Sequence, residues 1–156
     1  MKVLVSACLL GENCKYSGGN NRDPRVADWL RDQGCEAVPV CPEVLGGLPV
    51  PRTPAEIVDG VVTTRDGVNV DAAFRRGAAL ALEIAEREGA ELAILQPRSP
   101  SCGARQVYDG TFSGRKVPGM GVFAGLLRER GVRILEPEDL KSARIGDCSG
   151  DRFVVE

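Results

Sequence analysis

The sequence predicts an α/β protein, a single-domain three-layer sandwich with helices on both faces of a mostly parallel, Rossmann-like sheet. Short apolar runs typical of buried strands alternate along the chain with helical patterns, which is the order expected of such a sheet. The chain has 156 residues, enough for one domain with a sizeable core. Hydrophobic residues make up 43% and charged residues 27%, which are ordinary values for a globular protein.

In chain order, the first expected elements are a strand at residues 3–5, a helix at 24–33 and a strand at 37–40. The strands are predicted from continuous apolar runs of the kind that a parallel sheet buries on both faces. The helix begins where Asp23 can cap it and Pro24 fits its first turn, and Gly34 ends it. Pro39 suggests either curvature of the second strand or an edge position. The proline- and glycine-rich stretch at 41–54 is too rigid for a random linker.

The rest of the chain predicts a hairpin at 61–70, a helix at 72–88, a strand at 92–95, a small ribbon at 107–117, a helix at 121–130 and a strand at 132–135. The Asp66-Gly67 dipeptide is typical of a hairpin turn, and Asp71 is expected to cap the long helix. Gly89 is expected to end that helix. Residues 1–156 are interpreted as one domain, whose polar end, from about residue 142, is a loosely held tail.

Charge and composition exclude several function classes. Lys and Arg number 20 and Asp and Glu 22, so the formal net charge of −2 gives no strong signal for binding nucleic acid or anionic membranes. No apolar run approaches the roughly 20 residues of a membrane span, and no signal-peptide pattern opens the chain. We therefore expect a cytoplasmic protein, as a monomer or small homo-oligomer. With 0 histidines, the chain has no Ser-His-Asp or Cys-His catalytic arrangement and no His-ligated metal site.

Three of the 6 cysteines share one context. Cys8, Cys41 and Cys102 each follow a predicted parallel strand, and the carboxyl ends of such strands lie along one edge of the sheet, so the three are expected to converge. Without an export signal, metal, cluster or thiol chemistry is favoured over disulfides. Three thiolates without histidine suit an iron–sulfur cluster better than zinc. A [4Fe-4S] cluster normally takes four thiolates, so three would leave one iron open as a Lewis acid for a substrate atom.

Other interpretations of the cysteines stay open at this point. The same three residues could be small buried hydrophobic side chains, or ligands of a structural zinc in a small binding module. Cys14 is a candidate fourth cluster ligand, because it lies close to Cys8 in the chain. Cys35 is expected to pack in the core, and Cys148 is expected to be a surface thiol.

Four ordered motifs resemble the signatures of the thiouracil desulfidase family, long catalogued as a domain of unknown function. Residues 6–18, SACLLGENCKYSG, resemble the first signature. Residues 41–48, CPEVLGGL, together with 51–56, PRTPAE, resemble the second. Residues 98–103, RSPSCG, and residues 108–114, YDGTFSG, complete the set. The resemblance covers roughly residues 2–135.

The resemblance implies a [4Fe-4S] cluster held by three cysteines, which match Cys8, Cys41 and Cys102. It implies that the thiocarbonyl sulfur of a thiolated pyrimidine binds the open iron, and that thiouracil becomes uracil and sulfide without net redox change. By motif position, the catalytic carboxylate and hydroxyl are Glu43 and Ser99. Glu43 would act as general base on water and then as general acid, and Ser99 would donate a hydrogen bond to the sulfur or the ring.

These assignments have alternatives. Glu43 could instead cap backbone N–H groups of the glycine turn that follows it, and Ser99 could stabilise the turn before the next proline. Ser101 is expected to bond a cluster sulfur or the backbone. Arg52 and Arg98 are candidates to orient an anionic substrate. For the whole protein, the alternatives are an iron–sulfur or sulfur carrier that turns over no free base, and the small zinc-binding module.

Overall fold

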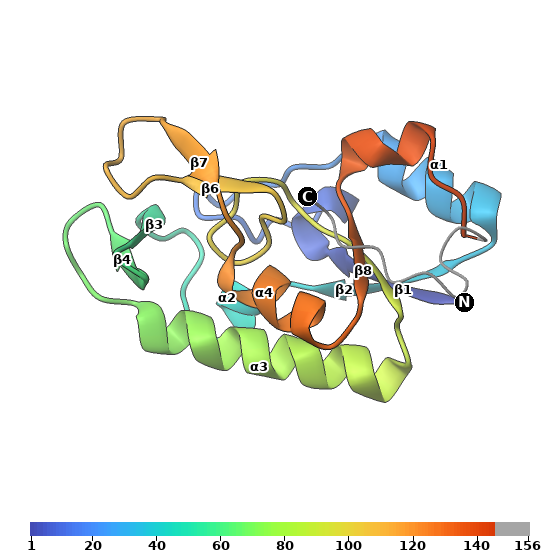
Figure 1. Cartoon of the computed structure of the whole chain (residues 1–156), viewed down its shortest axis with the longest axis horizontal. Coiled ribbons are helices and arrows are strands. Elements are labelled where there is room, and N and C mark those ends of the chain that lie inside the picture. The colour runs from blue at the N-terminus through green and yellow to red at the C-terminus, as the bar shows by residue number, and fades with distance from the viewer. Residues whose placement is uncertain (146–156) are drawn as a thin grey trace.

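The computed structural model describes residues 1–145, which build a four-stranded sheet between two layers of helices (Figure 1). The strands are β1 (Lys2–Ser6), β2 (Glu36–Val40), β5 (Leu92–Ile94) and β8 (Arg133–Leu135). Their order is β2-β1-β5-β8, and every neighbouring pair is parallel. The predicted fold class is confirmed, as are the four expected strands. Pro39 lies in β2 at the edge of the sheet, as predicted.

Helices cover both faces of the sheet, with α1 (Pro24–Gln33) and the 3-10 helix η2 (Pro137–Lys141) on one face and α3 (Asp71–Glu88) and α4 (Val122–Glu129) on the other. Successive residues of a strand point to opposite faces, so β1 contributes Val3 and Val5 to the first core and Leu4 to the second. All three side chains are fully buried. Burial on both faces explains why the strand is a continuous apolar run in the sequence.

Local signals set most of the helix ends. Asp23 caps α1 by accepting the N–H of Arg25 at 3.0 Å, and Gly34 ends the helix in the left-handed region. Gly89 ends α3 in the same way. The prediction that Asp71 caps α3 is wrong, because Asp71 is the first helical residue and its carboxylate accepts the N–H of Val62 in the preceding strand.

The predicted hairpin at 61–70 is present in part, and its first strand also pairs with a segment that precedes it. The strand β4 (Val61–Thr64) pairs antiparallel with β3 (Ala55–Val58), a strand that the sequence did not indicate. Asp59 and Gly60 join them with φ values of 50° and 80°, and two positive φ angles are what a type I′ hairpin turn requires. Beyond the second Asp-Gly turn, the N–H of Thr64 donates to the carbonyl of Val68 at 2.8 Å and the N–H of Val70 donates to the carbonyl of Val62 at 2.9 Å. An isolated antiparallel bridge joins Asn69 to Thr63, so the predicted return of the chain is present.

Three further elements frame the carboxyl end of the sheet. The predicted ribbon is present as β6 (Gln106–Tyr108) and β7 (Lys116–Pro118), and it lies beside the β3–β4 hairpin (Figure 1). Two short helices that were not predicted, η1 (Ala7–Leu10) and α2 (Pro42–Leu45), directly follow β1 and β2. They place the first two cysteine loops at the same edge of the sheet.

Residues 142–145, which the sequence assigned to a loosely held tail, are packed against α1. The indole N–H of Trp29 donates to the carbonyl of Ala143 at 2.9 Å, and the N–H of Ile145 donates to the side chain of Gln33 at 3.0 Å. Residues 146–156, including Cys148, lie outside the described residues. Within residues 1–145, no helix combines the length and the apolar character that crossing a lipid bilayer requires.

Candidate active site

A cavity of about 840 Å³ lies at the carboxyl end of the sheet. The loops after β1, β2 and β5 form one part of its wall, and the β3–β4 hairpin and the β6–β7 ribbon contribute another. All five predicted site residues line it: Cys8, Cys41, Cys102, Glu43 and Ser99. The cavity therefore occupies the place where ligands bind in open parallel sheets, and the predicted convergence of the cysteine loops is confirmed.

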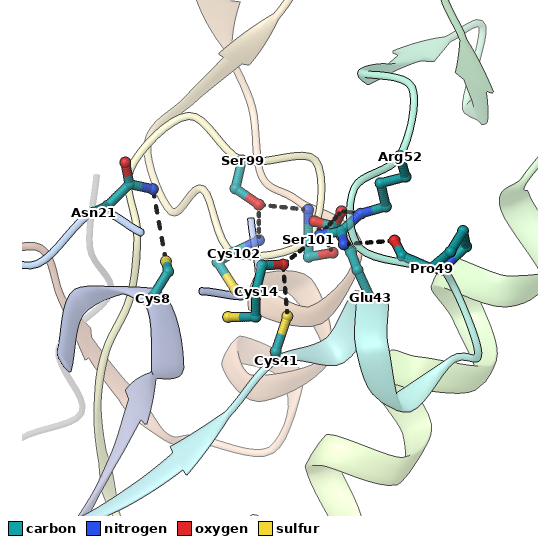
Figure 2. Close-up of polar contacts among 10 residues, drawn as sticks. All are labelled: Cys8, Cys14, Asn21, Cys41, Glu43, Pro49, Arg52, Ser99, Ser101 and Cys102. Carbon is teal, nitrogen blue, oxygen red and sulfur yellow. Dashed lines mark hydrogen bonds and ion pairs between the residues drawn. The ribbon is translucent and has the colours of Figure 1, made fainter. Parts of the chain in front are cut away.

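The three predicted ligand cysteines come from three separate segments. Cys8 lies in η1, Cys41 directly precedes α2, and Cys102 lies in the loop after β5 (Figure 2). Burial raises the pKa of the Cys102 thiol, and the nearby sulfurs of Cys8 and Cys41 raise it further. Burial also raises the pKa of Cys8, with a smaller contribution from Cys41. The three sulfurs are thus close enough to repel one another as thiolates, which a positively charged metal group would relieve.

Two polar side chains donate hydrogen bonds to these sulfurs. The amide nitrogen of Asn21 donates to Cys8 Sγ at 3.7 Å (Figure 2). The hydroxyl of Ser6 bonds Cys102 and thereby counteracts the rise of its pKa that burial causes. Both donors favour the thiolate, which is the form of cysteine that binds metals. The sequence offers no reason to predict Asn21 or Ser6 as site residues, because only the folded structure shows which sulfur each of them contacts.

Cys14 lies in the same cavity beside Cys41. The sulfur of Cys41 is 3.8 Å from the carbonyl oxygen of Cys14, and the two thiols also hydrogen-bond. The hydrogen bond from Cys14 lowers the pKa of Cys41 to about 7 and raises the pKa of Cys14. Since the thiol of Cys41 also donates to the carbonyl oxygen of Cys14, the two residues are held side by side in the cavity wall. Cys35 packs against the other core, as predicted.

The chemistry of the ligand set bears on the choice between zinc and a cluster. Cys8, Cys41 and Cys102 line the cavity, and the chain has 0 histidines. Thiolate sulfur without imidazole is a donor set that suits iron–sulfur clusters. The residues present therefore fit a cluster.

Glu43, in the first turn of α2, has a partner for each of its carboxylate oxygens. Arg52 Nε donates to Oε1 at 3.0 Å, and the hydroxyl of Ser101 donates to Oε2 at 3.1 Å (Figure 2). The side chains of Arg52 and Glu43 are only 8% and 16% exposed. Arg52 is itself held by the carbonyl oxygens of Cys14 and Pro49. These contacts orient a charged carboxylate on the wall of the cysteine cavity.

The structure bears on two further expectations from the sequence. Arg52 lines the cavity with its guanidinium bonded to Glu43 and to two backbone carbonyls, and the prediction that it orients an anionic substrate stays a prediction. Ser101 was expected to bond a cluster sulfur or the backbone, but its hydroxyl donates to Glu43 and only 1% of the residue is exposed. Both residues therefore support the carboxylate, Arg52 from nine residues further along the chain and Ser101 from a distant loop.

Ser99 stabilises its own turn, which was the alternative to a catalytic role that the sequence left open. Its Oγ accepts the backbone N–H groups of Ser101 and Cys102, both at 3.1 Å. Both contacts use the oxygen as acceptor, so neither engages the hydroxyl proton. Ser99 lines the cavity, and the prediction that it donates a hydrogen bond to a substrate stays a prediction.

Two facing glycines hold α2 against α3. A Cβ added to Gly77 would lie 1.7 Å from the carbonyl oxygen of Pro42, and one added to Gly46 would lie 2.0 Å from the carbonyl oxygen of Ala73. The position of Glu43 on α2 depends on this close approach. In the sequence, Gly77 is only a weak helix former in the middle of a helix, so nothing marked it as part of the site.

We expect Gly77→Ala to lower the Tm by about 5–10 °C, because the new methyl group would push α2 away from α3 at a cost of about 3 kcal/mol. Thermal unfolding followed by circular dichroism measures the effect. The control is Gly125→Ala in α4, where no atom lies within 4 Å of the added Cβ and the Tm should stay constant or rise. Equal Tm values for Gly77→Ala and the parent protein would contradict the tight contact.

Comparisons with known proteins agree with this geometry. The family model described as 2-thiouracil desulfurase matches residues 3–139, which include all the site residues named above. A solved structure, the [4Fe-4S]-dependent thiouracil desulfidase TudS, is 41% identical with a TM-score of 0.83 over 90% of this chain and 93% of that one. The protein YbbK of Bacillus subtilis (strain 168), described as uncharacterized, is 38% identical over 148 residues, 88% of this chain and 97% of its own. The chain belongs to the 2-thiouracil desulfurase family.

Proposed function

We propose that this protein is a [4Fe-4S]-dependent desulfidase that converts thiolated pyrimidines such as 2-thiouracil into uracil and sulfide. The observation that carries the proposal is the convergence of Cys8, Cys41 and Cys102 with the Glu43 carboxylate in one cavity. Membership of the family and the 41% identity to the thiouracil desulfidase TudS support it. The cavity, at about 840 Å³, is of the size that binds small molecules.

Cys8, Cys41 and Cys102 are the residues that would hold the cluster. When bound, it would supply an open iron that polarises the C=S bond as a Lewis acid. The contacts of Asn21 and Cys14 with these cysteines favour the thiolate form that such a group requires. The excess negative charge of three thiolates in a partly buried site also suits a cationic group.

In this proposal Glu43 moves the protons. The overall reaction is a hydrolysis, in which C=O replaces C=S and the two protons of water leave with the sulfur. No electrons are gained or lost. The carboxylate takes one proton as water attacks the ring carbon and gives it to the sulfur, and it then carries the second proton from the new C–OH group to the departing sulfur. The bonds from Arg52 and Ser101 hold the carboxylate in one orientation for both transfers.

In this proposal Ser99 orients the substrate. The two backbone N–H groups that its Oγ accepts hold the hydroxyl at a fixed position on the cavity wall. Its proton is then available to a sulfur, oxygen or nitrogen of the pyrimidine. A donor fixed in advance loses little entropy when the substrate binds.

The test is sulfide release from 2-thiouracil and 4-thiouracil by anaerobically reconstituted protein, with iron and labile sulfide counted in the same sample. We expect about four irons per chain and many turnovers. A loaded cluster that releases no sulfide from either compound would contradict the enzymatic function and favour a carrier. Zinc without labile sulfide in anaerobically purified protein would contradict the cluster itself.

A further inference from the structure

The turn between β6 and β7, residues 109–114, forms part of the cavity wall through Phe112 and Gly114. Phe112 has a φ of 57°, in the left-handed region that bulky side chains rarely adopt. Such a conformation persists only where surrounding contacts impose it, and it is concentrated at sites that bind ligands. The contacts that hold Phe112 in this conformation therefore point to a role in binding a ligand.

Glu56 in β3 is the side chain that holds this turn. One of its carboxylate oxygens, Oε1, accepts the N–H of Gly110 at 2.9 Å and the N–H of Phe112 at 3.1 Å. Hydrogen bonds to a charged acceptor are stronger than neutral ones, and these two lie on either side of Thr111. Glu56 thereby ties the β6–β7 ribbon to the β3–β4 hairpin, and it lines the same cavity.

Further contacts leave the turn little freedom. Gly110 has a φ of 92° and packs so closely on β3 that an added Cβ would lie 2.7 Å from the carbonyl oxygen of Ile57. At the tip of the turn, Asp109 accepts both the N–H and the hydroxyl of Thr111, and that hydroxyl also bonds Ser113. The aromatic ring that follows Thr111 is therefore held at a defined place on the wall.

Four aromatic side chains line the cavity: Tyr16, Phe74, Tyr108 and Phe112. Phe74 is 2% exposed and belongs to the core, whereas Tyr16 is 47% exposed. Tyr108 and Phe112 are both half-buried on the ribbon, but Phe112 is the aromatic residue in the turn that Glu56 holds. A flat heterocycle gains free energy by packing on an aromatic face, whatever its substituents.

We propose that Phe112 packs against the pyrimidine ring of the substrate and that Glu56 is a positioning residue that holds Phe112 in place. The inference rests on the proposed function, because the ring in question is that of the thiolated pyrimidine. Phe112 then selects planar ring substrates, while the proton transfers depend on residues elsewhere in the cavity.

The test combines equilibrium binding of uracil by calorimetry with steady-state kinetics on 2-thiouracil, both on cluster-loaded protein. Phe112→Leu keeps an apolar side chain of similar bulk but removes the ring, so we expect the Kd for uracil and the KM to rise about tenfold, with a much smaller change in kcat. Phe112→Tyr keeps the ring and should limit the rise to about twofold. The control Glu129→Leu, on the exposed end of α4, should change neither constant.

Glu56 is tested with a matched pair of variants. Glu56→Leu removes the acceptor and should raise Kd and KM about as much as Phe112→Leu does. Glu56→Gln keeps an oxygen that can accept both N–H groups, so it should recover most of the loss. Equal iron content in every variant would show that the effect does not arise from the cluster.

Uracil binding separates this proposal from the proposed function. If the parent protein binds uracil and the variants follow the expected order, the proposal stands even where no sulfide is released. Unchanged uracil binding in Phe112→Leu would overturn it, as would a parent protein that binds no uracil. A loss in Glu56→Gln as large as in Glu56→Leu would remove the positioning role of Glu56. If Glu56→Leu fails to fold, the Phe112 variants still decide the role of the ring.

Discussion

Serine in place of Cys8, Cys41 or Cys102 is expected to abolish both the iron–sulfur cluster and the release of sulfide. Each of the three side chains lines the cavity and comes from a different strand end, so none can substitute for another. A serine hydroxyl is nearly the same size as the thiol, but oxygen is a much poorer ligand than thiolate sulfur for an iron–sulfur cluster. The variants should therefore fold while holding little iron. Iron, labile sulfide and turnover are measured on anaerobically reconstituted protein.

Two other cysteines provide controls for this experiment. Cys35→Ser should keep full iron content, because Cys35 packs against the core on the opposite face of the sheet. Cys14→Ser should also keep its iron, since a serine hydroxyl can donate a hydrogen bond to Cys41 as the thiol does. Loss of iron in Cys14→Ser would show that Cys14 is a fourth ligand and would overturn the assignment of three.

Glu43→Gln is expected to keep the cluster and to lower kcat by about 10²–10⁴-fold, the usual contribution of a general acid–base residue. Glutamine has the shape of glutamate and can still contact Ser101 and Arg52, but it cannot take a proton from water. Since Glu43 is not among the proposed ligands, iron content should equal that of the parent protein. Steady-state kinetics with 2-thiouracil, on samples of matched iron content, measures the change.

The matched control is Glu129→Gln, because Glu129 is exposed at the end of α4 and does not line the cavity. Its kcat should equal that of the parent protein. Full activity in Glu43→Gln would remove Glu43 from the mechanism. Loss of iron in the same variant would instead indicate that the ion pair with Arg52 supports the cysteine loops, and that Glu43 is structural.

Two differences between the predicted and the observed fold have the same physical origin. The sequence contains Asp-Gly at 59–60 and at 66–67, and both dipeptides are typical of hairpin turns. Both turn the chain back onto β4, but the earlier one closes the longer ladder, in which β4 pairs with residues 55–58. Asp71 satisfies an N–H of β4 in place of its own helix. In each case a contact between segments adds to or replaces what the local sequence predicts.

By itself, the sequence determined the parallel α/β order, the four sheet strands and the arrival of Cys8, Cys41 and Cys102 at one edge. These features depend on apolar periodicity and on capping residues, which act over a few neighbouring positions, and on a general property of parallel sheets. The tertiary structure alone decided which groups contact one another in and beside the cavity: Arg52 and Ser101 with Glu43, Cys14 with Cys41, Gly77 with Pro42, and Glu56 with Phe112. Most of these partners lie far apart in the chain, and they meet only because the crossovers and the packing of two cores bring their segments together.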